Sequence, residues 1–225
     1  MTPPWTKCLE PVALSPTRPA AWVVHQQSPE AAAAISGLNP TAEELEDDVS
    51  RTPARRKARL ERRLLLRVLA ARWLAAPAAE VRVARSPAAG LEIVAPRRLY
   101  ASVASRGAWT GVAVAAEPIG VDVEQVAPLV HRPLDLLNPQ LAGALKCADS
   151  VAFAEAWTAL EAFLKLTGAG LAGLSSVTLT RQDVLRASDG VSHADISHCR
   201  LGGHVFACAN LVEGAVRAKW IRAGG

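Results

Sequence analysis

Short apolar runs occur along the whole chain, separated by polar or turn-forming residues, and two longer stretches have helical character. The short runs predict strands at residues 20–26, 80–84, 91–94, 112–116, 119–124, 176–180, 204–210 and 215–221. The longer stretches predict helices over residues 53–76 and 150–166. A shorter helix is predicted within residues 38–48, where Thr41 is the expected N-cap and Glu44 its capping-box partner.

The predicted elements follow the order strand, helices, strands, and then again strand, helix, strands. This order is typical of an α+β fold rather than of alternating βα units. Because the two halves share their element order, we expect a duplicated architecture with an N-terminal half at residues 19–112 and a C-terminal half at residues 113–225. Residues 1–18 are rich in proline and are expected to form a loose tail or an edge covering.

Composition narrows the class of protein. Half of the 225 residues are hydrophobic and a fifth are charged, which is enough to bury a core. No window approaches 18 consecutive apolar residues, so we expect no transmembrane helix, and the N-terminus lacks the apolar centre of a secretory signal. The four cysteines form no CxxC pair, which favours reduced thiols in a cytoplasmic protein.

The net charge of +4 is unevenly distributed. Residues 1–110 contain 16 Lys/Arg and 10 Asp/Glu, whereas residues 111–225 contain 9 and 11. The first half therefore offers positive potential to an anionic ligand, and the second half collects carboxylates suited to a cation. Fluctuation of ordinary surface charge is the alternative interpretation.

Two acids lie two residues apart in the predicted strand IGVDVEQV. Asp122 and Glu124 would then project from one face, while Val121 and Val123 project from the other. Adjacent carboxylates on one face repel each other unless a cation lies beside them, and Mg²⁺ is an oxygen-seeking cation that keeps waters for substrate phosphates. The alternative is an edge strand with two solvated acids.

The predicted helix at 150–166 contributes a third acid. Glu161 and Lys165 are spaced i, i+4 beside an apolar stripe, which is the favourable orientation for a surface ion pair. The functional alternative is a third metal carboxylate with a lysine next to it.

These two segments together resemble the signature blocks of 4'-phosphopantetheinyl transferases of the surfactin-synthetase type. That family has a G-[IV]-D-[IV]-E block and then W-[ST]-x-K-E-[AS]-x-x-K, and the resemblance extends from about Ala20 to the C-terminus. The matching residues here are Gly120, Asp122, Glu124, Trp157, Thr158, Glu161, Ala162 and Lys165.

The resemblance implies a fold of two similar α+β halves packed as a pseudo-dimer, with coenzyme A in the cleft between them. It implies that Asp122, Glu124 and Glu161 bind Mg²⁺ on the coenzyme A pyrophosphate, and that Lys165 lies near the phosphates. The expected enzyme is a monomer that transfers 4'-phosphopantetheine to a serine of an apo acyl or peptidyl carrier protein, with Glu161 taking the serine proton. Such carriers are normally acidic, which fits a pI near 9.1.

The predicted first long helix is strongly basic, with nine Lys/Arg between residues 51 and 72 and Glu61 as its one acid. On a helix, four arginines fall near one line, namely Arg56, Arg59, Arg63 and Arg67. In the resembling family this region binds coenzyme A phosphates, which implies that role for Arg56 and Arg63. A solvated basic face is the alternative. A nucleic-acid interface is not expected, because few aromatic or base-reading groups accompany the arginines.

The chain departs from the family pattern at two positions. Leu160 stands where the family usually has a lysine, and Ser105 stands where it has a phosphate-binding histidine. Arg106 follows directly and could replace the lost positive charge, so we assign Ser105 and Arg106 to coenzyme A binding as well. The alternative function is a non-catalytic descendant that binds coenzyme A or a carrier protein without transferring the arm.

Overall fold

The computed structural model describes residues 5–6, 19–46, 52–86, 90–126, 133–146, 148–181 and 183–212. The strand predicted at 215–221 and most of the predicted tail lie outside these residues. None of the described helices combines the length and the apolar character that a membrane span requires.

The fold is α+β and consists of two halves, each with its own sheet. The first half contains β1 (Trp5–Thr6), β2 (Ala20–His25), α1 (Pro29–Ile35), α2 (Ala42–Glu46), α3 (Pro53–Leu74), β3 (Arg82–Ser86), β4 (Gly90–Ala95), β5 (Leu99–Arg106) and β6 (Trp109–Ala115). The second half contains β7 (Ile119–Gln125), the 3₁₀ turn η1 (Leu134–Leu136), α4 (Pro139–Lys146), α5 (Ser150–Thr167), the 3₁₀ turn η2 (Leu171–Ser176), β8 (Thr178–Arg181), β9 (Leu185–Ser188), β10 (His193–Leu201) and β11 (His204–Leu211).

The two sheets have the same topology. The first sheet has the order β1-β2-β6-β5-β4-β3 and the second has the order β7-β11-β10-β9-β8. β1 is a short parallel addition at the edge of the first sheet. Apart from it, each sheet has its first strand beside its last, and the other strands follow in reverse order of sequence. The duplicated order expected from the sequence is therefore present. The chain changes sheets at residues 116–118, so the expected boundary after residue 112 falls within β6.

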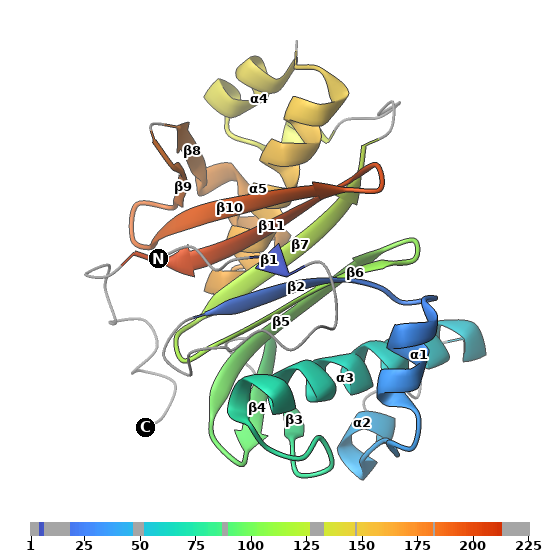
Figure 1. Ribbon diagram of the computed structural model, residues 1–225. Coiled ribbons are helices and arrows are strands. Elements are labelled where there is room, and N and C mark those ends of the chain that lie inside the picture. Colours follow the sequence, from blue (N-terminus) through green and yellow to red (C-terminus); the bar gives the residue numbers. More distant parts are fainter. Residues whose placement is uncertain are drawn as a thin grey trace.

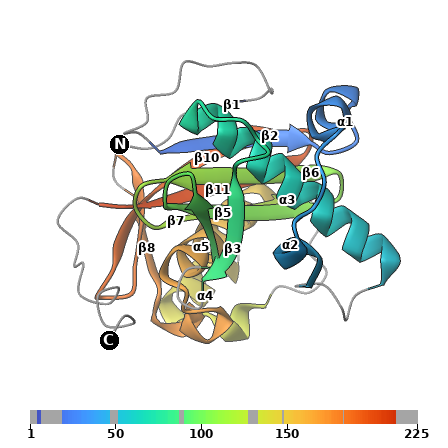
Figure 2. The same ribbon diagram turned by 90° about the horizontal axis from the view of Figure 1, so that it is seen from below.

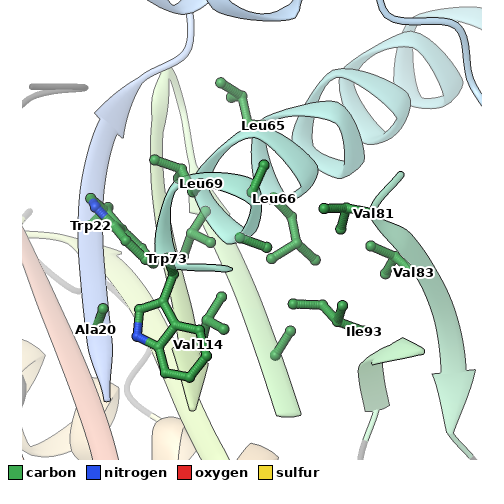
Figure 3. Packing of buried hydrophobic residues seen from close by; sticks show 14 of the residues in the cluster. Ala20, Trp22, Leu65, Leu66, Leu69, Trp73, Val81, Val83, Ile93 and Val114 are labelled. Atoms are coloured by element: carbon green, nitrogen blue, oxygen red, sulfur yellow. The ribbon is translucent and has the colours of Figure 1, made fainter. Parts of the chain in front are cut away.

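The molecule has four layers: α3, the first sheet, the second sheet and α5 (Figures 1 and 2). An apolar cluster that includes Leu66, Leu69 and Trp73 fills the space between α3 and the first sheet (Figure 3). A second cluster lies between α5 and the second sheet, and a third joins the two sheets face to face. Each sheet is therefore covered on both faces, which holds the two halves together through apolar burial.

Local signals explain where the helices begin and end. The capping box of α2 is present, since Thr41 donates its N–H to Glu44 Oε2 at 2.8 Å and Glu44 donates its N–H to Thr41 Oγ1 at 3.3 Å. Helix α3 begins at Pro53, as predicted, and stops when Ala75 adopts the left-handed conformation with φ of 52°. Helix α5 ends at Gly168, which has φ of 69°.

Candidate functional site

Strand β7 and helix α5 approach closely enough to bring their side chains together. A Cβ on Gly120 would lie 1.9 Å from the carbonyl oxygen of Ala162, so only glycine allows the backbone of α5 to rest on β7 at this point. Val121 and Val123 point the other way, into the cluster between the sheets. The alternation of the strand therefore turns Asp122 and Glu124 toward α5, as the sequence pattern predicts.

A hydrogen bond to the first sheet anchors β7. The N–H of Val121 donates to Ser102 Oγ of β5 at 3.0 Å, and Ser102 is buried. Because β7 is the edge strand of its sheet, this contact satisfies an amide that no neighbouring strand pairs. The strand that carries the two acids is thus fixed on both sides, by α5 and by β5.

The centre of the candidate site is an ion pair between the two elements. Lys165 Nζ of α5 donates to Asp122 Oδ1 of β7 at 2.5 Å, and the Asp122 side chain is only 5% exposed. The other carboxylate oxygen, Asp122 Oδ2, is buried without a hydrogen-bond partner among the described residues. A buried, unsatisfied carboxylate oxygen is costly and offers a ready ligand for a cation.

The other two acids share this environment. Burial, and then the negative charge of Asp122, raise the pKa of Glu161 to about 7, with Lys165 opposing the shift. Burial and Asp122 also raise the pKa of Glu124, which Arg106 and Lys165 oppose. The three carboxylates named by the sequence motifs therefore act on one another electrostatically.

A cation from the first half contacts this group of acids. Arg106, at the end of β5, places its Nε 3.5 Å from Glu124 Oε2. One residue earlier, Ser105 Oγ accepts a hydrogen bond of 2.9 Å from Arg62 Nη1 of α3. Arg106 thus points toward the acids of the second half, whereas Ser105 and Arg62 lie on the face of the first sheet that α3 covers.

The arginines of the predicted stripe on α3 differ in their burial and in their contacts. Arg67 is buried and pairs with Glu44 at 3.3 Å, and it also donates to the carbonyl oxygens of Asn39 and Ala78. It therefore ties α3 to α2 and to the neighbouring loops, and it belongs to the fold. Arg56 is exposed in the first turns, whereas Arg63 is 7% exposed. The sequence did not single out Arg62, because only the fold brings it to Ser105, 43 residues away.

A divalent cation fits the acids of this site. Among the described residues, no three His, Cys, Asp or Glu side chains already converge as a complete ligand set. Mg²⁺ does not need one, since it commonly takes one or two carboxylates together with waters and substrate phosphates. The unsatisfied Asp122 Oδ2 and the two neighbouring carboxylates with raised pKa values are the features that a cation would stabilise.

Within the part of the first half that the structure describes, no equivalent group of acids lies at the corresponding place. Strand β2 occupies in the first sheet the place that β7 occupies in the second. Its residues that face α3 are Ala20, Trp22 and Val24, and all three are buried in the apolar cluster beneath that helix (Figure 3). The duplicated fold therefore carries a carboxylate site on one half and an apolar core at the corresponding place on the other.

The comparison with protein families agrees with the class of site that the geometry defines. The family model of the 4'-phosphopantetheinyl transferase superfamily matches residues 118–210. This stretch runs from just before β7 into β11 and includes Asp122, Glu124, Glu161 and Lys165. The chain is thus similar, over its second half, to enzymes that transfer phosphopantetheine. A search of curated proteins gave no match.

Proposed function

We propose that this protein transfers the 4'-phosphopantetheine arm of coenzyme A to a serine of an acyl or peptidyl carrier protein, in a reaction that depends on Mg²⁺. The observation that carries the proposal is the meeting of Asp122, Glu161 and Lys165 between β7 and α5, inside the segment that matches the superfamily. We place the protein in the surfactin-synthetase type because both signature blocks are present and the chain contains two halves of the same topology. A monomer would therefore contain a complete site.

Asp122, Glu124 and Glu161 are the residues that would hold the divalent ion. When bound, Mg²⁺ would neutralise charge on the pyrophosphate of coenzyme A. Asp122 is the anchor of the set, since Lys165 fixes its position through one oxygen and its other, buried oxygen has no hydrogen-bond partner among the described residues.

Glu161 is suited to act as the general base. A pKa of about 7 allows this carboxylate to take a proton near neutral pH, which is the condition for efficient general-base catalysis. In the proposed step, the serine oxygen of the carrier attacks the phosphorus that carries the pantetheine arm. The bond from that phosphorus to the oxygen of 3',5'-ADP breaks, the serine proton passes to Glu161, and Lys165 stabilises the departing 3',5'-ADP.

The donor phosphates would be held from the first half. Arg106 contacts Glu124 from the end of β5, and Arg62 of α3 binds Ser105 one residue earlier on the other face of that strand. Guanidinium groups suit phosphate through paired hydrogen bonds. Arg56 and Arg63, assigned from the resemblance, lie on the same helix as Arg62. The cations and the acids thus come from opposite halves, which supports binding of an anionic donor between them.

Leu160, which stands where the family usually has a lysine, does not take a side chain away from the candidate site. Leu160 is fully buried in the cluster between α5 and the second sheet, so a different side chain is accommodated there as core. The departure at Ser105 is offset by Arg62, which brings a positive charge to that hydroxyl. Both observations favour a working enzyme over a non-catalytic descendant.

One experiment tests the proposal. The protein is incubated with coenzyme A, Mg²⁺ and an apo carrier protein, and the carrier is weighed by mass spectrometry. The proposal requires the mass of the 4'-phosphopantetheine arm to appear, and to be absent with EDTA or with the Asp122→Asn variant. Binding of coenzyme A without any mass change would instead identify the non-catalytic alternative.

A further inference from the structure

The two halves contain equivalent hairpin turns, which lie at the same end of the two sheets (Figure 1). The turn between β5 and β6 contains Gly107 and Ala108, and the turn between β10 and β11 contains Gly202 and Gly203. The first residues of the two turns have nearly the same φ, 58° at Gly107 and 56° at Gly202. The second residue of each turn accepts a backbone hydrogen bond of 2.8 Å, from the residue that follows β2 in one half and β7 in the other. The two turns are therefore matched positions of the duplicated fold.

Each turn is followed by a ring that contacts the turn of the other half. Trp109 follows the first turn, and His204 follows the second turn at the equivalent position. A Cβ on Gly202 would lie 2.8 Å from Cζ2 of Trp109, and a Cβ on Gly107 would lie 4.0 Å from Nε2 of His204. The centroids of the two rings are 6.2 Å apart. The two halves thus meet at this end through Trp109 and His204.

Further contacts fix the Trp109 ring in place. His25 of β2 packs nearly perpendicular to it with 4.9 Å between ring centroids, and Phe206 of β11 does so at 6.1 Å. His204 is fixed as well, because its Nδ1 donates a hydrogen bond of 2.8 Å to the carbonyl oxygen of Gly202, which can only accept. The indole is therefore held by side chains from both halves and cannot move without displacing them.

Trp109 also lies beside a cation of the candidate site. Arg106 is its direct cross-strand partner, so the two side chains project from the same face of the hairpin. Arg106 places its Nε 3.5 Å from Glu124 of the second half, although the arginine side chain is 60% exposed. A long, exposed side chain has many rotamers, and a fixed ring next to it reduces their number. Trp109 is therefore placed to restrict Arg106 to the side of the hairpin that faces Glu124.

We propose that Trp109 is a positioning residue for donor binding: held by the turn of the opposite half, it directs Arg106 toward the place where the phosphates of coenzyme A bind. This inference rests on the proposed function, in which Arg106 helps to hold the donor. Trp109 itself touches neither the donor nor the reacting atoms. Gly202 contributes to the site from the other half, because a side chain there would displace the indole.

The glycines of the second turn provide a matched pair of variants. Gly202→Ala places a Cβ against the indole, whereas a Cβ on Gly203 would meet nothing within 4 Å. Both positions have a positive φ, 56° and 72°, so both variants have the backbone cost of an alanine in the left-handed region. Neither variant replaces Trp109 or Arg106. A difference in coenzyme A binding between them therefore reports the displacement of the ring.

The experiment measures the binding of coenzyme A in the presence of Mg²⁺ by calorimetry, in the wild-type and Arg106→Gln backgrounds. In the wild-type background, Gly202→Ala should weaken binding at least about threefold, as a misplaced charge-assisted hydrogen bond does, and Gly203→Ala should leave binding unchanged. In the Arg106→Gln background, Gly202→Ala should have no further effect, because the side chain that the ring positions is gone.

Two replacements of the ring itself complete the test. Trp109→Leu removes the indole and should weaken coenzyme A binding as Gly202→Ala does. Trp109→Phe retains an aromatic ring between the two halves and should preserve most of the affinity. Thermal unfolding of each variant checks that it is folded at the temperature of the binding measurement.

Three results would overturn the inference: equal affinity of Gly202→Ala and Gly203→Ala, the same loss from Gly202→Ala with and without Arg106, or no effect of Arg106→Gln on binding. The second result is what a merely structural role of Trp109 predicts, because independent effects add. If Arg106→Gln weakens binding and Gly202→Ala does not, the positioning inference alone is wrong. If coenzyme A binds and the carrier remains unmodified, the proposed transfer is wrong, and the binding data still decide the role of Trp109.

Discussion

Lys165 binds Asp122 on the neighbouring strand, at 2.5 Å, instead of pairing with Glu161 one turn earlier on its own helix. The surface ion pair that helical spacing favours is thus replaced by a contact between α5 and β7. The lysine consequently neutralises a nearly buried acid, and Glu161 is left with a pKa raised to about 7. The same contact fixes the relative position of the two elements that carry the candidate metal ligands.

Removing the charge of Asp122 should abolish transfer without unfolding the chain. The variant Asp122→Asn keeps the shape of the side chain but removes the anchor of the acid group. We expect the transfer rate to fall at least about 100-fold, since one preorganised electrostatic contact in an active site is commonly worth about 3 kcal/mol. The assay is carrier mass at saturating coenzyme A and Mg²⁺, with thermal unfolding as the check on the fold.

A matched control exists on the same sheet. Asp195 on β10 accepts a hydrogen bond of 2.9 Å from Arg186 and lies outside the candidate site. Asp195→Asn should therefore transfer at the wild-type rate. A wild-type rate for Asp122→Asn under the same conditions would remove Asp122 from the site.

The close packing at Gly120 predicts a stability effect that is tied to the site. A Cβ there would lie 1.9 Å from the carbonyl oxygen of Ala162, and neither backbone can yield without moving α5 away from β7. We expect Gly120→Ala to lower the free energy of unfolding by about 2–4 kcal/mol, as overpacking at a tight backbone contact does. Urea denaturation measures this change.

Gly143 provides the comparison for that variant. It lies within α4, and a Cβ there would meet nothing within 4 Å. Gly143→Ala should be neutral or stabilise the protein by up to about 1 kcal/mol, because alanine has the higher helix propensity. Equal stability of the two alanine variants would show that β7 and α5 are not in the tight contact described above.

Much of this arrangement could be predicted from the sequence, because local patterns determine it. The helix periodicity, the capping box at Thr41 and the alternation around Asp122 are local signals, and the structure contains all three. Strands β5 and β10 were missed, since LYASVASR and HADISHCRL contain small and polar residues in place of an apolar run. They form strands because neighbouring strands pair with them on both edges, which is a property of the whole sheet.

The contacts across the site could not be predicted in the same way. Arg62 meets Ser105, and Lys165 meets Asp122, each over 43 residues of chain. Helical geometry gives the angular positions of the arginines around the axis of α3. It does not say which side of the helix packs on the sheet. The predicted stripe therefore included Arg67, which is a buried structural residue, and omitted Arg62.

Arginine variants on α3 test which cations hold the donor phosphates. Arg62 binds Ser105, the residue before Arg106, whereas Arg56 is exposed in the first turns of the helix. We expect Arg62→Gln to raise the KM for coenzyme A about tenfold, the size of a lost charge-assisted hydrogen bond, with a smaller effect on the KM for the carrier. Arg56→Gln is the matched variant and should have the smaller effect on coenzyme A. The reverse ranking would support the assignment of Arg56 from the family resemblance.

Dephospho-coenzyme A extends this comparison, because it lacks the 3'-phosphate. A variant of the arginine that contacts this phosphate should bind dephospho-coenzyme A as well as the wild type does. A variant of an arginine that contacts the pyrophosphate should lose affinity for both donors. Unshifted curves for every variant with both donors would mean that α3 does not hold the donor.

The raised pKa of Glu161 predicts how stability and metal binding depend on pH. Its pKa rises from 4.5 to about 7 on folding, so between these values the folded chain binds more protons than the unfolded chain. The stabilisation that this proton provides is therefore complete below about pH 4.5 and is lost as the pH rises toward 7. Because Glu161 is partly exposed, solvent screening should reduce the effect to the order of 1 kcal/mol. Glu161→Gln should remove this part of the pH dependence, which urea denaturation at several pH values would measure.

Metal binding should change with pH in the opposite direction. A divalent ion requires the ionised carboxylate, so its affinity should increase as the pH rises through about 7, and binding below that pH should release a proton. Calorimetry of Mg²⁺ binding in the presence of coenzyme A, in buffers with different ionisation enthalpies, counts the released protons. Glu161→Gln should reduce proton release and flatten the pH dependence. Glu155→Gln is the control, because Glu155 lies on the same helix but pairs with Arg200 of β10, and it should leave both unchanged. Full proton release in Glu161→Gln would show that another group takes up the proton and that Glu161 does not bind the metal.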